Sequence, residues 1–179
     1  FPKFDKFIEQ TKDVWTHLVD IRKSFEPRAE ELAKKYALAP YTMFIGSGAL
    51  WGETILFSMC ILEEMQWKRT RYITSADFFH GTLELVEPGV PVFLFMGEDE
   101  NRKLDERVRA FLTRGVTGDT DINVIDTAEF AIPGLDDEFR VIVSPWILSS
   151  LITDRLAAYY ETVTKHNLNY RRYYHQFDY

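Results

Sequence analysis

The chain of 179 residues is long enough for one domain with a buried core, and its hydrophobic fraction of 46% is ordinary for a globular protein. A net charge of −7 argues against a nucleic-acid surface, because basic residues occur only in short clusters such as Lys68-Arg69 and Arg171-Arg172. No apolar stretch reaches the length of a membrane span, no secretory signal is present, and the single cysteine, Cys60, excludes an intrachain disulfide framework. We therefore expect a cytoplasmic protein with no nucleic-acid or membrane partner.

The first forty residues favour two helices. Apolar side chains recur at helical spacing over residues 3–25 and predict an amphipathic helix. Pro27 suits the first turn of a second helix that runs to Pro40. We expect residues 1–40 to pack on the following domain or to link it to another. Because the chain opens at Phe1 with a helical segment, we also expect that further sequence precedes it.

From residue 41 onward, short apolar runs alternate with helical patterns, which is typical of a parallel sheet covered on both faces. Five runs are predicted as strands: residues 41–45, 69–75, 90–97, 121–126 and 140–145. The expected fold is α/β, a three-layer αβα sandwich with a five-stranded parallel sheet over residues 41–165. Residues 166–179 form an aromatic and basic tail without a clear period.

A glycine turn, Gly46-Ser47-Gly48, follows the first strand and opens a helix, so its backbone amides are suited to bind an anion. The turn lacks the Lys-Ser/Thr of a Walker A loop and the spacing of a dinucleotide-binding loop. Ser75, at the end of the next strand, is expected at the same edge of the sheet. The turn therefore binds substrate together with Ser75, or its glycines only permit a tight strand-to-helix connection.

Glu64 follows an apolar run, residues 55–62, that predicts a helix buried on every side. At helical spacing Glu64 shares a face with three apolar residues, Phe57, Cys60 and Ile61. Burial and the negative end of the helix dipole should raise the pKa of Glu64, which suits a general base that later returns its proton. Alternatively, the helix end emerges into water and both Glu63 and Glu64 are solvated.

Residues 46–95 resemble the SIS (sugar isomerase) domain family, in particular its fructosamine 6-phosphate deglycases, which act on fructoselysine or fructose-asparagine 6-phosphate. The resemblance rests on the glycine turn, the Glu-Met-x-Trp helix end, the Ser-x-x-Phe-x-His-Gly element and the Val-Glu-Pro-Gly-Val-Pro turn. It extends to Arg171-Arg172-Tyr173-Tyr174 and the closing Tyr179. The spacing of sixteen residues between Glu64 and His80 is also that of the isomerase half of glucosamine 6-phosphate synthase.

The resemblance implies that His80 opens the sugar ring and that Glu64 moves a proton from C1 to C2. In a deglycase the resulting imine at C1 is hydrolysed to glucose 6-phosphate and a free amine. No metal or organic cofactor is implied. Members are dimers in which the histidine can reach the neighbouring subunit's site, so Glu64 and His80 serve the same site or different ones. The tail is expected to cover the sugar, with Arg172 as a candidate contact for an anionic group. Alternatively, the charges of the tail are solvated or pair two subunits.

The sequence departs from the family in three places. His-Gly-Pro is His80-Gly81-Thr82 here and Ser-Gly-Glu is Ser75-Ala76-Asp77, which leaves the pose of His80 open. The Ser/Thr-rich phosphate loop of the family's first SIS domain has no counterpart. We therefore expect this chain to be the C-terminal SIS domain of a longer protein and to be inactive alone.

Three functions stay open at this point. The first is a deglycase, favoured by the tail and by the block around Trp67. The second is an aldose–ketose isomerase or an aminotransferase-type enzyme, which would share Glu64 and His80. The third is a sugar-phosphate-sensing module without catalysis, which would need neither residue. The identity of the released amine is not determined.

Overall fold

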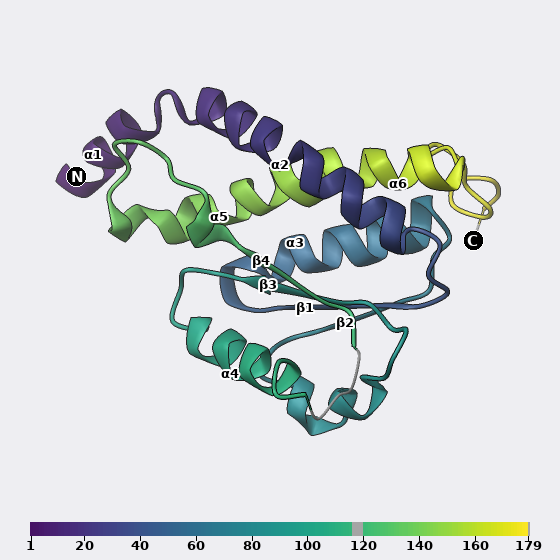
Figure 1. The fold of residues 1–179 in the computed structure, drawn as a ribbon. Coiled ribbons are helices and arrows are strands. Elements are labelled where there is room, and N and C mark those ends of the chain that lie inside the picture. The colour runs from purple at the N-terminus through teal and green to yellow at the C-terminus, as the bar shows by residue number, and fades with distance from the viewer. Residues whose placement is uncertain (116–119, 179) are drawn as a thin grey trace.

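The computed structural model describes residues 1–115 and 120–178. At its centre is a sheet of four parallel strands in the order β2-β1-β3-β4. The strands are β1 Thr42–Gly46, β2 Thr70–Ile73, β3 Val92–Met96 and β4 Ile122–Asp126. Because the strands are parallel, their carboxyl ends meet at one edge of the sheet, as Figure 1 shows.

Most helices cover one face of the sheet (Figure 1). This layer contains α1 Pro2–Thr11, α2 Val14–Tyr36, α3 Trp51–Ile55, α5 Asp137–Leu151 and α6 Ala157–Thr164. Helix α3 continues directly as a π-helical segment, Leu56–Met65, and a second π-helical segment, Ile152–Leu156, joins α5 to α6. The opposite face carries α4 Arg102–Leu112 and two 3₁₀ turns, Phe78–His80 and Thr82–Leu85.

Strand residues alternate between two hydrophobic clusters, as the pleat of a sheet requires. Phe44, Phe93 and Phe95 point toward the helical layer, where their rings stack. Their neighbours point toward α4 and the 3₁₀ turns: Met43, Ile45, Val92, Leu94 and Met96. Every residue of β1 and β3 is buried, so both faces of the central strands are covered, and the αβα layering expected from the sequence is confirmed.

The expected fifth strand is wrong. Residues 140–145 lie inside α5, and in the described part of the chain the sheet ends at β4. Val141 and Ile142 favour a strand by composition, but a short apolar run cannot by itself distinguish a buried strand from a buried helix. Arg140 bonds Glu98 from within this helix and lies against the carbonyl oxygens of Thr127 and Phe130.

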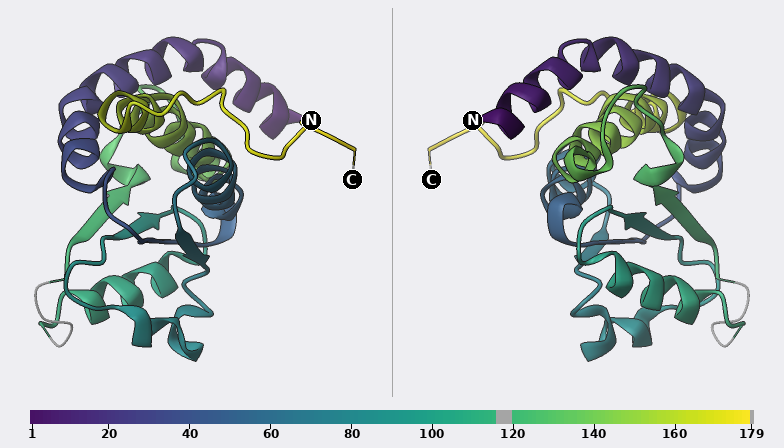
Figure 2. Two further views of the ribbon diagram at one scale, coloured as in Figure 1. Left: turned by 90° about the vertical axis from the view of Figure 1, so that its right-hand side faces the viewer. Right: turned by 90° about the vertical axis from the view of Figure 1, so that its left-hand side faces the viewer.

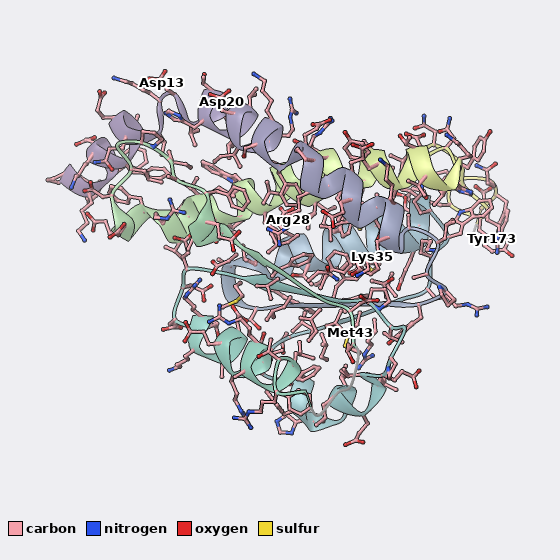
Figure 3. All side chains as sticks on the ribbon, in the orientation of Figure 1. Asp13, Asp20, Arg28, Lys35, Met43 and Tyr173 are labelled. Carbon is pink, nitrogen blue, oxygen red and sulfur yellow. The ribbon has the colours of Figure 1, made fainter. Side chains whose placement is uncertain are left out.

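The two N-terminal helices differ in their bounds from the expected ones. The first helix ends at Thr11 and the next begins at Val14. Pro27 lies inside α2 instead of starting a new helix. Helix α2 buries one side in the main core, whereas α1 buries no residue. Two basic side chains connect α2 to the edge strand: Arg28 donates to the carbonyl oxygen of Val124, and Lys35 pairs with Asp121 at 2.6 Å (Figure 3).

The helix after the glycine turn is only partly buried, contrary to the sequence expectation. Phe57, Ser58 and Leu62 are buried, but Met59 is 39% exposed. In a π-helix the hydrogen bonds span five residues instead of four, which changes which side chains share a face. One side of this segment is therefore in the core and another reaches the surface.

One continuous helix among the described residues, Asp137–Thr164, is long and apolar enough to cross a membrane. From the sequence we expected no stretch of this kind. Half of its most apolar stretch is buried inside the protein. It packs against α2 through Trp146, which stacks on Trp15 at 5.7 Å, and through Tyr160, which is fully buried. Core packing accounts for its apolar character.

Candidate active site

Glu64 lies near the end of the first π-helical segment and is bound by the C-terminal tail. Nε of Arg171 donates to Oε1 of Glu64 at 2.9 Å, and the two side chains are 20% and 34% exposed. Both belong to a surface cavity of about 390 Å³. The cavity is lined by Glu63, Glu64, Trp67, Lys68, Arg171, Arg172, Tyr173 and Tyr174.

The helix ends in an unusual conformation beside Glu64. The amide of Gln66 bonds the carbonyl oxygen of Ile61, five residues back, and Trp67 then adopts a left-handed conformation with φ of 53°. Glycine is the usual residue at such a position, and bulky side chains there are rare. Strained backbone of this kind, like π-helical segments, occurs preferentially at functional sites. The indole of Trp67 becomes part of the cavity wall.

The tail is attached to this helix end by several contacts. Gln66 donates from Nε2 to the carbonyl oxygen of His166 at 2.7 Å and accepts from the hydroxyl of Thr164 at 2.7 Å. The ring of His166 packs edge-on against Trp67 at 4.4 Å. The guanidinium of Arg172 also lies over the ring of Trp67, 4.4 Å from the centre of the indole. These contacts hold the start of the tail over Glu64.

Beyond these contacts the tail is exposed. Tyr173 is 63% and Phe177 58% exposed, and the last described residues extend away from the helical layer (Figures 2 and 3). The segment therefore lies beside Glu64 without enclosing it.

Glu63 has a different environment from Glu64. Its Oε1 accepts a hydrogen bond of 2.5 Å from the hydroxyl of Thr70 at the start of β2. Glu63 thus fastens the helix end to the sheet.

Of the apolar partners expected for Glu64, Cys60 is the one whose environment it affects. Burial, with a further contribution from the charge of Glu64, raises the pKa of the Cys60 thiol. Phe57 is fully buried and faces Phe44 and Tyr160 in the core. Glu64 is paired with Arg171 at a partly open surface, so its expected isolation on an apolar face is wrong. The proton affinity inferred from that isolation stays a prediction.

The structure does not bring His80 to Glu64. His80 is exposed and ends the 3₁₀ turn on the α4 side of the sheet, where Phe78 and Phe79 pack against Phe111. The Glu64 cavity opens on the helical side. Within one chain the two predicted catalytic residues therefore lie on different faces of the sheet.

The glycine turn is occupied by a side chain of the protein itself. The amide of Ala49 donates to Oδ2 of Asp99 at 2.6 Å. Gly48 has φ of +55°, and a Cβ there would lie 2.1 Å from the same oxygen. The carboxylate thus takes the place that an external anion would need, and glycine is required for its close approach.

Ser47 and Ser75 belong to a buried network that joins the carboxyl ends of three strands. The amide of Ser75 donates to Oγ of Ser47 at 2.7 Å, and the hydroxyl of Ser75 donates to Asp105 at 2.5 Å. The other oxygen of Asp105 accepts from the amide of Gly97 at 3.3 Å. Burial raises the pKa of Asp105 to about 6, because hydrogen bonds from Ser75 and Gly97 offset only part of the desolvation. In this chain both serine hydroxyls are engaged in internal bonds.

The open side of the glycine turn is strongly acidic. A cavity of about 630 Å³ there is lined by Gly48, Ala49, Glu98, Asp99, Glu100, Asn101, Asp137, Glu138 and Val141. Five carboxylates disfavour a phosphate at this position. Among residues 1–115 and 120–178, no group of three or more His, Cys, Asp or Glu is arranged to hold a metal ion.

Sequence reasoning missed Arg171 and Asp105. Arg171 was noted only as part of a motif, since contact between a tail and a helix more than a hundred residues away has no local signal. Asp105 had one: it shares the buried face of α4 with Val108 and Leu112, where a carboxylate needs internal partners.

Comparison with known proteins gives this arrangement a context. No protein-family model matches the chain. It is 29% identical over 174 residues to fructosamine deglycase FrlB of Bacillus subtilis (strain 168), and this alignment covers 96% of the present chain and 51% of FrlB. It is 30% identical over 175 residues to fructoselysine 6-phosphate deglycase of Escherichia coli (strain K12), and that alignment covers 96% of the present chain and 47% of the E. coli protein.

The chain is similar to fructosamine deglycases over most of its own length. It spans about half the length of the curated deglycases that it matches. A Bacillus subtilis protein described as a phosphosugar isomerase has the same fold with a TM-score of 0.90 at 28% identity, covering 99% of this chain and 53% of that one. The C-terminal domain of glucosamine-fructose-6-phosphate aminotransferase from Francisella tularensis shares the fold alone, with a TM-score of 0.66 at 13% identity over 93% of this chain and 47% of that one. The expected SIS fold is confirmed.

Proposed function

We propose that this chain is the Glu64-bearing half of a fructosamine 6-phosphate deglycase, a hydrolase that releases glucose 6-phosphate and an amine. The observation that carries the proposal is the position of Glu64 in an open cavity at a strained helix end, in a chain similar to deglycases over 96% of its length. A carboxylate held beside a sugar-sized cavity is suited to move a proton between neighbouring carbons.

The proposed chemistry needs no cofactor. Glu64 takes a proton from C1 of the open-chain aminated fructose 6-phosphate, and the C1–H electron pair forms the enaminol while the C2 oxygen gains a proton. The proton on Glu64 returns at C2, the nitrogen lone pair forms a C1 iminium, and water hydrolyses it. Before these steps, His80 assists opening of the sugar ring.

We propose further that the active unit is a cytoplasmic homodimer in which His80 reaches the partner's Glu64 cavity. The separation of the two residues on different faces of the sheet supports a site shared between subunits. The exposure of His80 supports it too, because a partner could reach the imidazole.

The phosphate subsite is proposed to lie outside this chain. The glycine turn is filled by Asp99 and faces carboxylates, and the curated deglycases are about twice as long as this chain. A second SIS domain would supply the Ser/Thr-rich loop. The division into helices over residues 1–40, a SIS domain over 41–165 and a covering tail over 166–179 is part of the same proposal, and the chain alone is expected to be inactive.

Within the Glu64 cavity, Arg172 is the proposed contact for an anionic group of the substrate. Its guanidinium is held over Trp67, and no ion pair of Arg172 occurs in the described part of the chain. Gly46, Ser47, Gly48 and Ser75 stay predicted substrate contacts, although their internal bonds favour a role in shaping the edge of the sheet.

The second candidate is an aldose–ketose phosphosugar isomerase, which would use the same base. The similarity to a protein described as a phosphosugar isomerase supports it. A non-catalytic sensor would not require the strained helix end beside Glu64.

A coupled assay for glucose 6-phosphate on the full-length parent tests the proposal, with fructoselysine and fructose-asparagine 6-phosphates as substrates. Release is expected, and Glu64→Gln should lower it by about 10²–10⁴-fold, the usual contribution of general acid–base catalysis. Glu63→Gln makes the same charge change one residue away and should retain activity within about threefold, since Glu63 bonds Thr70. Interconversion of aldose and ketose phosphates without amine release would establish the isomerase. Near-normal turnover of Glu64→Gln would remove Glu64 as the base.

A further inference from the structure

We infer that Arg171 is a positioning residue for proton transfer: it holds Oε1 of Glu64 and assigns the transfer to Oε2. The inference rests on the proposed role of Glu64 as the base. It concerns a tail residue that the sequence identified only as part of a motif.

The guanidinium of Arg171 is fixed from several directions. Nε donates to Oε1 of Glu64 at 2.9 Å, and one terminal nitrogen donates to the carbonyl oxygens of Leu168 at 2.7 Å and Tyr170 at 2.9 Å. The side chain is 20% exposed, so water competes little for these donors. A guanidinium with three protein acceptors is itself restrained, and its charge-assisted bond to Oε1 limits how the Glu64 carboxylate can turn.

The backbone that carries Arg171 is also anchored. Leu168 donates from its amide to Glu161 at 3.0 Å, and His166 accepts from Gln66. Arg172, the next residue, packs over Trp67 on the same helix end as Glu64. The base and its partner are therefore held by the same short piece of structure.

The two oxygens of Glu64 differ as a result. Oε1 accepts from Arg171, and among the described residues no hydrogen bond uses Oε2. Because Glu64 lines the cavity, Oε2 is the oxygen available to a substrate there. A proton taken from C1 by Oε2 can return from the same oxygen to C2, on the same face of the enaminol, without rotation of the carboxylate.

The test uses four variants of the full-length parent: Arg171→Gln, Arg171→Lys, Arg171→Ala and, as the matched control, Lys165→Gln. Lys165 is exposed at the C-terminal end of α6, just before the tail, so its replacement makes the same charge change without touching Glu64. Arg171→Gln should lower kcat by about 10–100-fold with KM changed less than about threefold, since a misoriented base costs rate more than binding. Arg171→Lys should be intermediate, because an ammonium cannot reproduce the fork of donors.

Two further readouts separate positioning from a structural role. Guanidinium chloride at millimolar concentration should restore activity to Arg171→Ala several-fold, whereas sodium chloride at the same ionic strength should not. Independently of turnover, labelling of Glu64 by a water-soluble carbodiimide and an amine, read by peptide mass spectrometry, should rise several-fold in Arg171→Gln and stay unchanged in Lys165→Gln.

The outcomes are distinct. Unchanged labelling in Arg171→Gln would mean that the pair does not form and would overturn the inference. Increased labelling with wild-type kcat, while Glu64→Gln is inactive, would overturn it too and leave the proposed function intact. If Glu64→Gln retains full turnover, the proposed function fails first, and the role of Arg171 fails with it.

Discussion

The hydroxyl of Ser75 donates a 2.5 Å hydrogen bond to Oδ1 of Asp105, and each residue is only 1% exposed. Through Ser47 and Gly97, this pair ties together the ends of β1, β2 and β3. It is the part of the sheet edge that carries the loop leading to His80, so its protonation state bears on the whole edge.

Asp105 should make folding stability depend on pH. Its pKa is raised to about 6 in the folded state, against roughly 3.9 in an unfolded chain. Between these values the folded state binds more protons, so the contribution of Asp105 to stability is largest below about pH 4 and is lost as the pH rises to about 6. Asp105→Asn should therefore gain about 1–3 kcal/mol relative to the wild type between pH 4 and pH 7.

Urea unfolding of the wild type and Asp105→Asn at both pH values measures this difference. Asp20→Asn, at an exposed position on α2, is the control and should follow the wild type at both (Figure 3). Parallel stability curves for Asp105→Asn and the wild type would contradict the raised pKa.

Gly48 should not tolerate a side chain. Gly48→Ala would place a methyl group 2.1 Å from Asp99 and force alanine into φ of +55°. We expect a loss of about 1–3 kcal/mol in the free energy of unfolding. Gly52→Ala is the matched control, because nothing lies within 4 Å of its Cβ position in α3, and it should be neutral or stabilising by up to about 1 kcal/mol. Equal effects of the two substitutions in urea denaturation would refute this reading of the turn.

Gln66 should govern docking of the tail. Gln66→Ala removes the bonds to His166 and Thr164, so the segment around Arg171 should open more often. Tryptic cleavage after Arg171 and Arg172 under native conditions should become about tenfold faster, the equivalent of 1.4 kcal/mol, a typical net value for such hydrogen bonds. Gln176→Ala, in the exposed part of the tail, serves as the comparison and should leave the cleavage rate unchanged.

A site shared between subunits should show complementation. If His80 acts on the partner's Glu64 cavity, mixing inactive Glu64→Gln and His80→Asn parents creates heterodimers with one intact site. Random exchange should then restore up to about a quarter of wild-type turnover. The measurement needs proof of subunit exchange by differently tagged copies; exchange without recovered activity would place both residues in one subunit's site.

The layers of the fold could be predicted from the sequence because β1 and β3 are short, mostly apolar runs next to clear helical periods. The two wrong predictions, a strand over residues 140–145 and a helix start at Pro27, occurred where the sequence pattern fits more than one structure. Val141, Ile142 and Val143 are apolar and β-branched, yet they lie inside α5, a helix in which Pro145 is accommodated. Pro27 is likewise accommodated inside α2, although proline more often marks a first turn.

The candidate site was predicted only in part. Glu64 and His80 were selected through resemblance, and the position of each relative to the sheet could not be obtained from spacing. The partner of Glu64 lies 107 residues away, and the occupant of the glycine turn, Asp99, lies in the loop after another strand. Contacts of that range depend on how the tail and loops pack, which no local pattern records.

Because of Asp99, the conformation of the glycine turn does not depend on a bound ligand. In a loop shaped to receive an anion, the protein supplies one from its own chain, so the loop is satisfied before any metabolite arrives. Gly48 is therefore required for folding and not for binding a ligand, so we expect it to be retained even in a descendant that does not bind a sugar phosphate.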